Sequence, residues 1–262
     1  MPAYRQAEFV AEALDSLLAQ TYTDWEVAVV DDGSPDNVAD IVRPYAERDP
    51  RIRFHHTDNH GVSAARNYGI RHTDGEFIVA LDADDKLAPT YLERCVSEFL
   101  ARPEAKIVYT DWKFFGVTHR TPHPQYTGYK SLLVNNVIYC SAMFRRRDYE
   151  AAGGYDENIP FGFEDWDLWI RILDEDSIVI KVPAQLFYYR IKKISRSTGL
   201  NTAERLEKTT AYIYSKYRDR YDKFFGNRLS ELQRLDALET RLAKWKRRSV
   251  FSRLWYALTG RF

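Results

Sequence analysis

The order in which helical and strand-like patterns follow one another constrains this chain more than any other feature. Apolar residues recur at helical spacing in one set of segments, and short apolar runs typical of buried strands lie between them. The expected helices cover residues 8–20, 38–47, 62–71 and 91–100, and the expected strands cover residues 25–31, 51–55, 76–82 and 106–110. This alternation predicts an α/β fold, in which a mostly parallel sheet carries helices on both faces.

Acidic clusters follow two of these strands. Asp31 and Asp32 end one strand, and the run Asp82-Ala83-Asp84-Asp85 ends another. Ligands of open α/β sheets bind at the carboxyl ends of the strands, and two carboxylates one residue apart suit a hard divalent cation that also binds phosphate. Taken alone the Asp82-Ala83-Asp84 pattern is weak, because acidic residues often cap the helix that follows or solvate a loop.

Composition limits the classes of partner. The chain has 262 residues, of which 45% are hydrophobic, enough for one sizeable α/β core and an appendage. Its 38 basic and 38 acidic residues cancel, so no overall field favours nucleic acid. Cys95 and Cys140 lack a Cys-x-x-Cys spacing, and no apolar run is long enough to span a membrane. We therefore expect a cytoplasmic protein that binds no nucleic acid.

The regular alternation ends after residue 110. We expect a strand over residues 137–144, a helix that begins at Glu164, and two strands over residues 178–182 and 186–190. From about residue 202 the pattern is helical, with leucines spaced three or four residues apart at Leu229, Leu232, Leu235, Leu238 and Leu242. This stripe indicates either a helical hairpin within the chain or an oligomer interface. The predicted domains are residues 1–200 and 201–262.

The two ends of the chain each suggest something further. Basic and aromatic residues alternate after Glu239, as in Lys244-Trp245-Lys246, a composition typical of an anchor at the inner face of the cell membrane; solvated charge explains it equally well. At the other end, Met1-Pro2-Ala3-Tyr4 leaves no room for an apolar strand before the first helix. We expect a late-started form of a longer chain, whose leading residues would supply that strand.

Five motifs occur together in this sequence: Pro2-Ala3-Tyr4, residues 30–34, residues 61–69, residues 81–85 and Glu164-Asp165. In order and spacing, over about residues 1–199, they resemble the family-2 inverting glycosyltransferases of the GT-A fold. Each motif is weak by itself, whereas the set is specific. The resemblance implies a nucleotide-sugar donor, usually a UDP-sugar, and a divalent metal ion, Mn²⁺ or Mg²⁺.

The resemblance also implies a role for each matched residue. Tyr4 would lie against the uracil, Asp31 would accept a hydrogen bond from the base, and Asp165 would be the general base. The implied donor contacts are Pro2, Tyr4, Asp31, Asp32, Arg66, Asn67, Asp82 and Ala83, and the implied metal ligands are Asp84 and Asp82. Apart from the resemblance, we expect Glu164 and Trp166 to contact the acceptor. Sugar faces stack on indole rings such as those of Trp166 and Trp169, although core packing explains Trp169 equally well.

One position departs from the family pattern. Members often carry a histidine where this chain has Lys192, and a protonated lysine cannot ligate a metal. Lys192 would instead pair with the donor diphosphate, and phosphates and waters would complete the metal shell.

These motifs predict transfer of a sugar to a hydroxyl of a glycan or lipid-linked acceptor, as in the synthesis of bacterial surface polysaccharides. Inversion needs one carboxylate near the acceptor hydroxyl and positive charge on the departing diphosphate. The alternative is a nucleotide-sugar-binding scaffold without turnover. A sugar-nucleotide synthase would carry a glycine-rich loop near the start, and an aspartyl phosphatase a Thr or Val after the second Asp; this sequence has neither.

Overall fold

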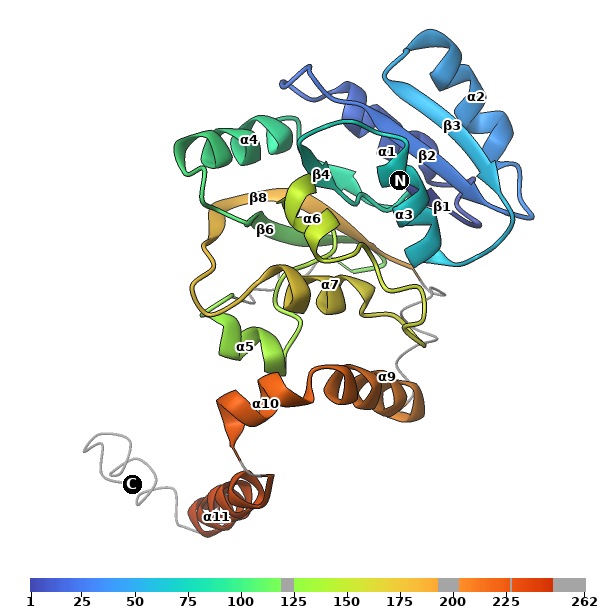
Figure 1. Cartoon of the computed structure of the whole chain (residues 1–262). Helices are drawn as coiled ribbons and strands as arrows, with labels where there is room; N and C mark the ends of the chain where they lie inside the picture. Colours follow the sequence, from blue (N-terminus) through green and yellow to red (C-terminus); the bar gives the residue numbers. More distant parts are fainter. Residues whose placement is uncertain (119–124, 193–202, 227, 247–262) are drawn as a thin grey trace. The chain divides into compact units, whose positions relative to one another are not determined.

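A three-stranded parallel sheet forms the first part of the molecule (Figure 1). Its strands are β1 (Pro2–Ala3), β2 (Val27–Asp32) and β3 (Ile52–Thr57), with β2 in the centre. The arrangement comes from a computed structural model, which describes residues 1–118, 125–192, 203–226 and 228–246. Asp31 and Asp32 end the central strand, as the sequence predicted.

The segment before the first helix forms a very short strand, and the expected late start of the chain stays a prediction. Pro2 pairs with Val30 and Ala3 pairs with Asp31, so β1 extends the sheet with two residues. The sequence pattern could not reveal a strand this short, because two residues show no periodicity.

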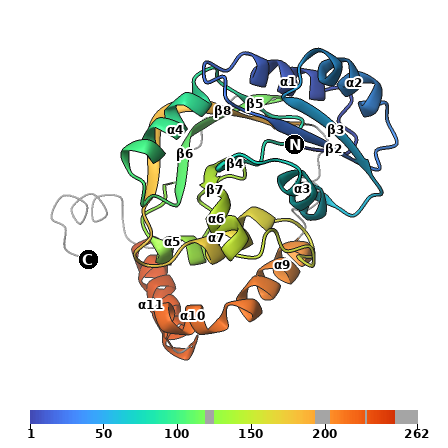
Figure 2. The same ribbon diagram turned by 45° about the horizontal axis from the view of Figure 1, so that its top comes forward.

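Three helices cover the two faces of this sheet: α1 (Val10–Leu18), α2 (Val38–Arg48) and α3 (Val62–Arg71). Figure 2 shows α1 and α2 on one face and α3 on the other. Val10 and Leu14 of α1 pack with Val29, Val42 and other apolar residues in one buried cluster, which explains the helical spacing in the sequence. On the opposite face Gly69 lets α3 approach β2, since a Cβ there would lie 3.3 Å from a methyl of Val30.

A second sheet of five strands follows, in the order β4-β7-β6-β8-β5. The strands are β4 (Phe77–Val79), β5 (Lys86–Leu87), β6 (Ile107–Gly116), β7 (Met143–Arg145) and β8 (Val179–Ile191). β6 and β8 are parallel, and the other three pairs are antiparallel. The α/β class and the parallel first sheet are confirmed, and the antiparallel pairs refine the prediction. The two runs expected at residues 178–182 and 186–190 form one long strand, β8.

Four further helices belong to this half: α4 (Tyr91–Ala101), α5 (Tyr129–Val134), α6 (Arg146–Ala151) and α7 (Glu164–Ile172). Two indole rings fix α7. Trp169 is fully buried and donates from Nε1 to the Ile138 carbonyl at 3.0 Å, while Trp166 donates to the Leu132 carbonyl at 2.6 Å. The position of the α7 N-terminus is therefore set by the core beneath it.

The chain divides into two compact units, residues 1–212 and 213–262. The last helices are α9 (Ala203–Lys216), α10 (Arg218–Phe225) and α11 (Arg228–Lys246). On α11 the side chains of Leu235, Leu238 and Leu242 are about half exposed. The side chains of Leu229 and Leu232, the tail beyond Lys246 and the predicted boundary at residue 200 lie outside what the structure describes. Within the described ranges, no helix combines the length and apolar character needed to cross a bilayer.

Candidate active site

Three carboxylates meet in the turn after β4. One oxygen from each of Asp82, Asp84 and Asp85 lies within 4.8 Å of the others. The turn is closed by the Asp85 amide, which donates to the Asp82 carbonyl at 3.1 Å. Asp85 is buried, and its Oδ2 has no hydrogen-bond partner among the described residues. We call residues 82–85 the acidic loop.

Negative charge is crowded in the acidic loop. Burial raises the pKa of Asp84, and the Asp82 charge raises it further, whereas Lys192 opposes the shift. Burial and then the charge of Asp84 raise the pKa of Asp85 well above its ordinary value. A cation bound next to these carboxyl groups would stabilise their ionised forms, which burial and mutual repulsion disfavour.

Arg66 joins the acidic loop to the start of α7. Its guanidinium donates from Nη2 to Asp82 Oδ1 and from Nη1 to Glu164 Oε1, each at 2.7 Å. Arg66 is buried, and its Nε has no partner among the described residues. The sequence predicted a contact between Arg66 and the nucleotide-sugar. In the structure, two of the three guanidinium nitrogens already bond to Asp82 and Glu164 and so join the two halves of the site.

Asp165 occupies the first turn of α7, beside Glu164. Asn136 donates to its Oδ2 at 3.0 Å, and the Trp166 amide donates to its Oδ1 at 2.8 Å. Burial, followed by the neighbouring Glu164 charge, raises the pKa of Asp165 to about 6. A carboxylate with that pKa takes up a proton near neutral pH more readily than an ordinary aspartate, which suits a general base.

The backbone leading into α7 is strained. Phe163 has φ 63°, in the left-handed region that side chains other than glycine rarely adopt, and it follows Gly162 at φ 89°. The Phe163 ring packs edge-on against Trp166 with centroids 5.5 Å apart. Such backbone strain persists where packing over-determines it, and it often marks a functional site.

The structure does not support the predicted acceptor contacts of Glu164 and Trp166. Trp166 is 6% exposed, so no indole face is open for a sugar to stack on. Glu164 is equally buried and pairs with Arg66. Both side chains belong to the buried framework of the site, Trp166 through its hydrogen bond to the Leu132 carbonyl and Glu164 through its ion pair with Arg66.

The end of β2 forms the other side of the predicted donor site. Asp31 accepts from the Ser34 amide at 2.8 Å through Oδ1, and its Oδ2 lies 2.9 Å from Nδ1 of His56. Asp32 accepts from the amides of His60 and Gly61 at 2.8 and 2.9 Å. Asp32 therefore fixes the loop that enters α3, while Asp31 shares its carboxylate with a histidine.

Tyr4 lies next to this loop and is 40% exposed, and the Arg5 guanidinium lies 5.4 Å from the centre of its ring. The Arg5 amide donates to Ser34 Oγ at 2.7 Å, which ties the segment after β1 to the loop after β2. Pro2 and Ala83 provide backbone and packing: Pro2 pairs with β2, and Ala83 is buried.

Asn67 has a different position from the one expected. Its amide group donates to the Tyr155 carbonyl and to Glu157, and its oxygen accepts from the Tyr149 hydroxyl and the Tyr155 amide, all within 2.9 Å. All four hydrogen-bonding positions are thus taken by the protein. Asn67 positions residues 149–157 and has no free group for a nucleotide.

Three residues near the site carried no role in the sequence-based reading: Asp85, Asn136 and Arg190. The Arg190 amide donates to Asp85 Oδ1 at 2.8 Å, and its Nε donates to the Asp84 carbonyl at 2.7 Å. In the sequence, Asp85 could be recognised as the third acid of the run Asp82-Ala83-Asp84-Asp85. Asn136 and Arg190 gave no local signal, because only the tertiary fold brings them to the acids.

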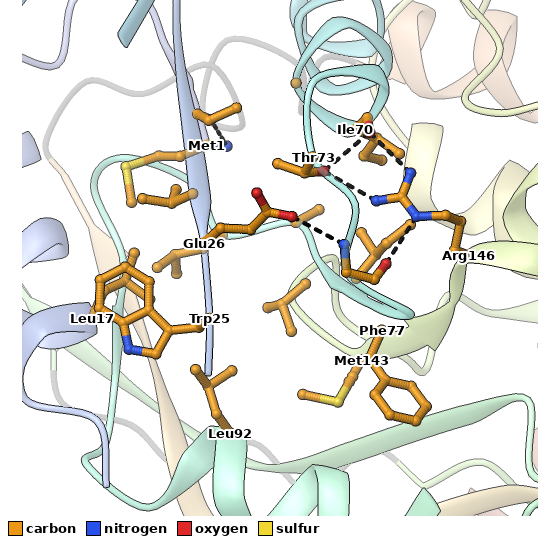
Figure 3. Close-up of a pocket in the computed structure, with 18 of the residues that line it drawn as sticks. Met1, Leu17, Trp25, Glu26, Ile70, Thr73, Phe77, Leu92, Met143 and Arg146 are labelled. Carbon is orange, nitrogen blue, oxygen red and sulfur yellow. Dashed lines mark hydrogen bonds between the residues drawn. The ribbon is translucent and has the colours of Figure 1, made fainter. Parts of the chain in front are cut away.

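A cavity of about 610 Å³ lies between β2 and β4, and Figure 3 shows its lining. Trp25, Leu17 and Phe77 give it an apolar wall, and Arg146 closes one end by donating to the carbonyls of Ile70 and Gly75. Arg66 borders the cavity, whereas Asp82, Asp84 and Asp165 do not. The cavity is therefore separate from the acidic loop.

Comparison with known proteins places the chain in a family. The model of glycosyl transferase family 2 matches residues 1–168, more than half of the chain, and the model of glycosyltransferase like family 2 matches residues 126–224. The chain belongs to glycosyltransferase family 2. The acidic loop, Asp31 and Asp165 all fall within the first match.

Family 2 relatives with established names include much longer proteins. Chondroitin synthase of Pasteurella multocida is 30% identical over 183 residues, which cover 66% of this chain and 18% of the synthase. The O-antigen biosynthesis protein RfbC of Myxococcus xanthus is 32% identical over 203 residues, 74% of this chain and 16% of RfbC. The chain thus spans less than a fifth of the length of either relative.

Solved structures share the fold. TarS of S. aureus, in complex with UDP-GlcNAc, superposes with a TM-score of 0.66 at 17% identity, over 85% of this chain and 71% of that structure. The mannosyltransferase PcManGT of Pyrobaculum calidifontis, in complex with GDP-Man and Mn²⁺, superposes with a TM-score of 0.58 at 20% identity. The match covers 98% of this chain and 81% of that structure. The GT-A fold expected from the motifs is confirmed.

Proposed function

We propose that this protein transfers a sugar from a nucleotide-diphosphate donor to a hydroxyl of a glycan or lipid-linked acceptor, with inversion at the anomeric carbon. One observation carries the proposal: a single buried guanidinium, that of Arg66, joins the acidic loop to the turn that holds Asp165. A site for a diphosphate and a base for an acceptor are thus held in one framework.

In this proposal Asp165 is the base. Its carboxylate takes the proton of the acceptor hydroxyl while the hydroxyl oxygen bonds to the anomeric carbon. The bond from that carbon to the diphosphate breaks, and the nucleotide diphosphate leaves with the electron pair. Asn136 and the Trp166 amide hold the carboxylate in place, and the pKa of about 6 matches a base that works near neutral pH.

The acidic loop fits a divalent cation, either Mn²⁺ or Mg²⁺. It offers three carboxylates, the hard oxygen ligands that these ions prefer, and Asp85 Oδ2 is buried without a hydrogen-bond partner among the described residues. We assign Asp84 and Asp82 as its ligands. When bound, such an ion would offset the charge that develops on the departing diphosphate.

Tyr4 and Asp31 are proposed to receive the base of the nucleotide. The exposed ring of Tyr4 can stack on a base, and Asp31 Oδ2, now 2.9 Å from His56, can accept a hydrogen bond from it. The names of the structural neighbours, which hold UDP-GlcNAc and GDP-Man, support a UDP-sugar or GDP-sugar donor.

The acceptor is proposed from the relatives. A chondroitin synthase and an O-antigen biosynthesis protein both build polysaccharide by name, which supports a growing glycan as acceptor and a role in surface polysaccharide synthesis. Contact with the inner face of the membrane through the basic aromatic tail stays a prediction, because that tail lies outside the described residues.

Calorimetry with UDP- and GDP-sugars in the presence of Mn²⁺, followed by assays of donor hydrolysis and transfer, tests the proposal. The wild type should bind one class of donor and turn it over, and the product should show the inverted anomeric configuration by NMR. Asp165→Asn should still bind the donor but lose about a hundredfold or more in rate. Asp176→Asn, at an exposed acid, is the matched control and should behave as wild type.

The same experiment separates an enzyme from a scaffold. Donor binding without hydrolysis or transfer, in the wild type and with every acceptor tried, would favour the scaffold. A protein that binds no nucleotide-sugar, with or without metal, contradicts both readings.

A further inference from the structure

Two acids of the acidic loop already have a cation supplied by the chain. Arg66 pairs with Asp82 at 2.7 Å, and the Lys192 ammonium pairs with Asp84 Oδ2 at 2.6 Å. Both members of the second pair are largely buried, with 18% of each side chain exposed. A largely buried ion pair at this distance is less screened by solvent than a surface pair.

The position of Lys192 is fixed by its surroundings. Its ammonium also donates to Gln6 Oε1 at 3.1 Å and lies 5.1 Å from the centre of the Phe9 ring. Two residues earlier, Arg190 bonds to the backbone of Asp84 and to Asp85, so residues 190–192 lie against the acidic loop. Lys192 is therefore a fixed part of the site.

We propose that the Lys192 ammonium acts as a built-in cation of the acidic loop, which neutralises Asp84 and lets the loop bind a nucleoside diphosphate without a divalent metal ion. The inference rests on the proposed function and deepens it. An unbalanced cluster of carboxylates would repel a diphosphate, whereas a lysine beside it is a point charge that can reach a phosphate oxygen.

A second consequence concerns the metal itself. At 2.6 Å the ammonium occupies the approach to Asp84 Oδ2, so a metal ion must displace it or use the other oxygen. Lys192 therefore weakens metal binding in the absence of nucleotide while it strengthens metal-free binding of the diphosphate. Removing its charge should move these two affinities in opposite directions, which a merely structural lysine would not do.

Calorimetry on the full chain tests this inference, with UDP and GDP titrated in excess EDTA and Mn²⁺ titrated without nucleotide. The proteins are the wild type, Lys192→Met, Lys192→Arg and Lys181→Met. Lys181 is the matched control, since it pairs with Asp111 at 2.6 Å with similar exposure, away from the acidic loop. Circular dichroism and thermal melting verify that each variant folds.

We expect the wild type to bind a nucleoside diphosphate in EDTA. Lys192→Met should bind it about tenfold more weakly and bind Mn²⁺ about tenfold more tightly, as expected from loss of one charged contact. Lys192→Arg should keep metal-free binding, and Lys181→Met should match the wild type. A Lys192→Met protein with both affinities unchanged, or both weakened, would overturn the inference.

The outcome for the wild type distinguishes this inference from the proposed function. If the wild type binds nucleotide only when Mn²⁺ is present, the built-in cation is wrong and the proposed function stands. If it binds no nucleotide under either condition, both are wrong.

Discussion

At the scale of single residues, the proposed role of Asp165 as the base predicts how activity depends on pH. Its pKa of about 6 in the folded protein lies above the ordinary value of 3.8, so the carboxyl holds its proton further up the pH scale than in the unfolded chain. Activity should therefore fall as pH drops through about 6. The same shift has the opposite effect on folding: the contribution of Asp165 to stability is full below pH 3.8 and is lost as pH rises to about 6.

Glu164→Gln tests the cause of that shift. The Glu164 charge is the second contributor after burial, so its removal should move the acid limb of the kcat/KM profile to lower pH. A full pH–rate profile of wild type and variant measures the change. An acid limb that stays in place would show that Asp165 is not the group that titrates.

Arg66 should matter for stability as well as for activity. Replacing it with Met leaves Asp82 and Glu164 without their buried cation, and breaking a buried pair costs about 3 kcal/mol or more. Urea unfolding measures the loss. Arg102→Met is the control, because the exposed Arg102–Glu98 pair should contribute less than about 1 kcal/mol. Equal losses in the two variants would contradict a special role for Arg66.

At the scale of elements, α7 shows which structural features the sequence can predict and which it cannot. The helix and its start at Glu164 follow from periodicity and from the Glu164-Asp165 motif. The burial of Trp166 and Glu164 does not, because it depends on distant elements, on α5 for Trp166 and on Arg66 of α3 for Glu164. The antiparallel pairs of the second sheet could not be predicted either, because the sequence pattern of a strand does not show which strand it pairs with.

Trp166→Phe separates core packing from acceptor binding. The change removes the hydrogen bond to the Leu132 carbonyl and leaves that acceptor buried, so stability should fall by about 1–3 kcal/mol. The KM for the acceptor should stay close to that of the wild type. A thermal melt and acceptor kinetics measure the two effects, and a large rise in KM at unchanged stability would restore the stacking role.

At the scale of the whole molecule, the leucines of α11 favour association. Leu235, Leu238 and Leu242 are each about half exposed, and exposed apolar residues at helical spacing are typical of an interface. We predict that the full chain self-associates, as measured by light scattering. Replacing the three leucines with Gln should yield monomers, whereas Leu100→Gln, at an exposed leucine of α4, should not.

The two ion pairs made by Arg66 have a consequence for sequence variation among members of the family. Its guanidinium pairs with two carboxylates at once, on segments 82 residues apart in the chain, so loss of Arg66 removes a charged partner from both acids. Relatives that lose the arginine should therefore have lost or replaced Glu164 too, whereas Asp82 is also a proposed metal ligand and should be kept. In an alignment of this family positions 66 and 164 should covary, a pattern that needs no purified protein to observe.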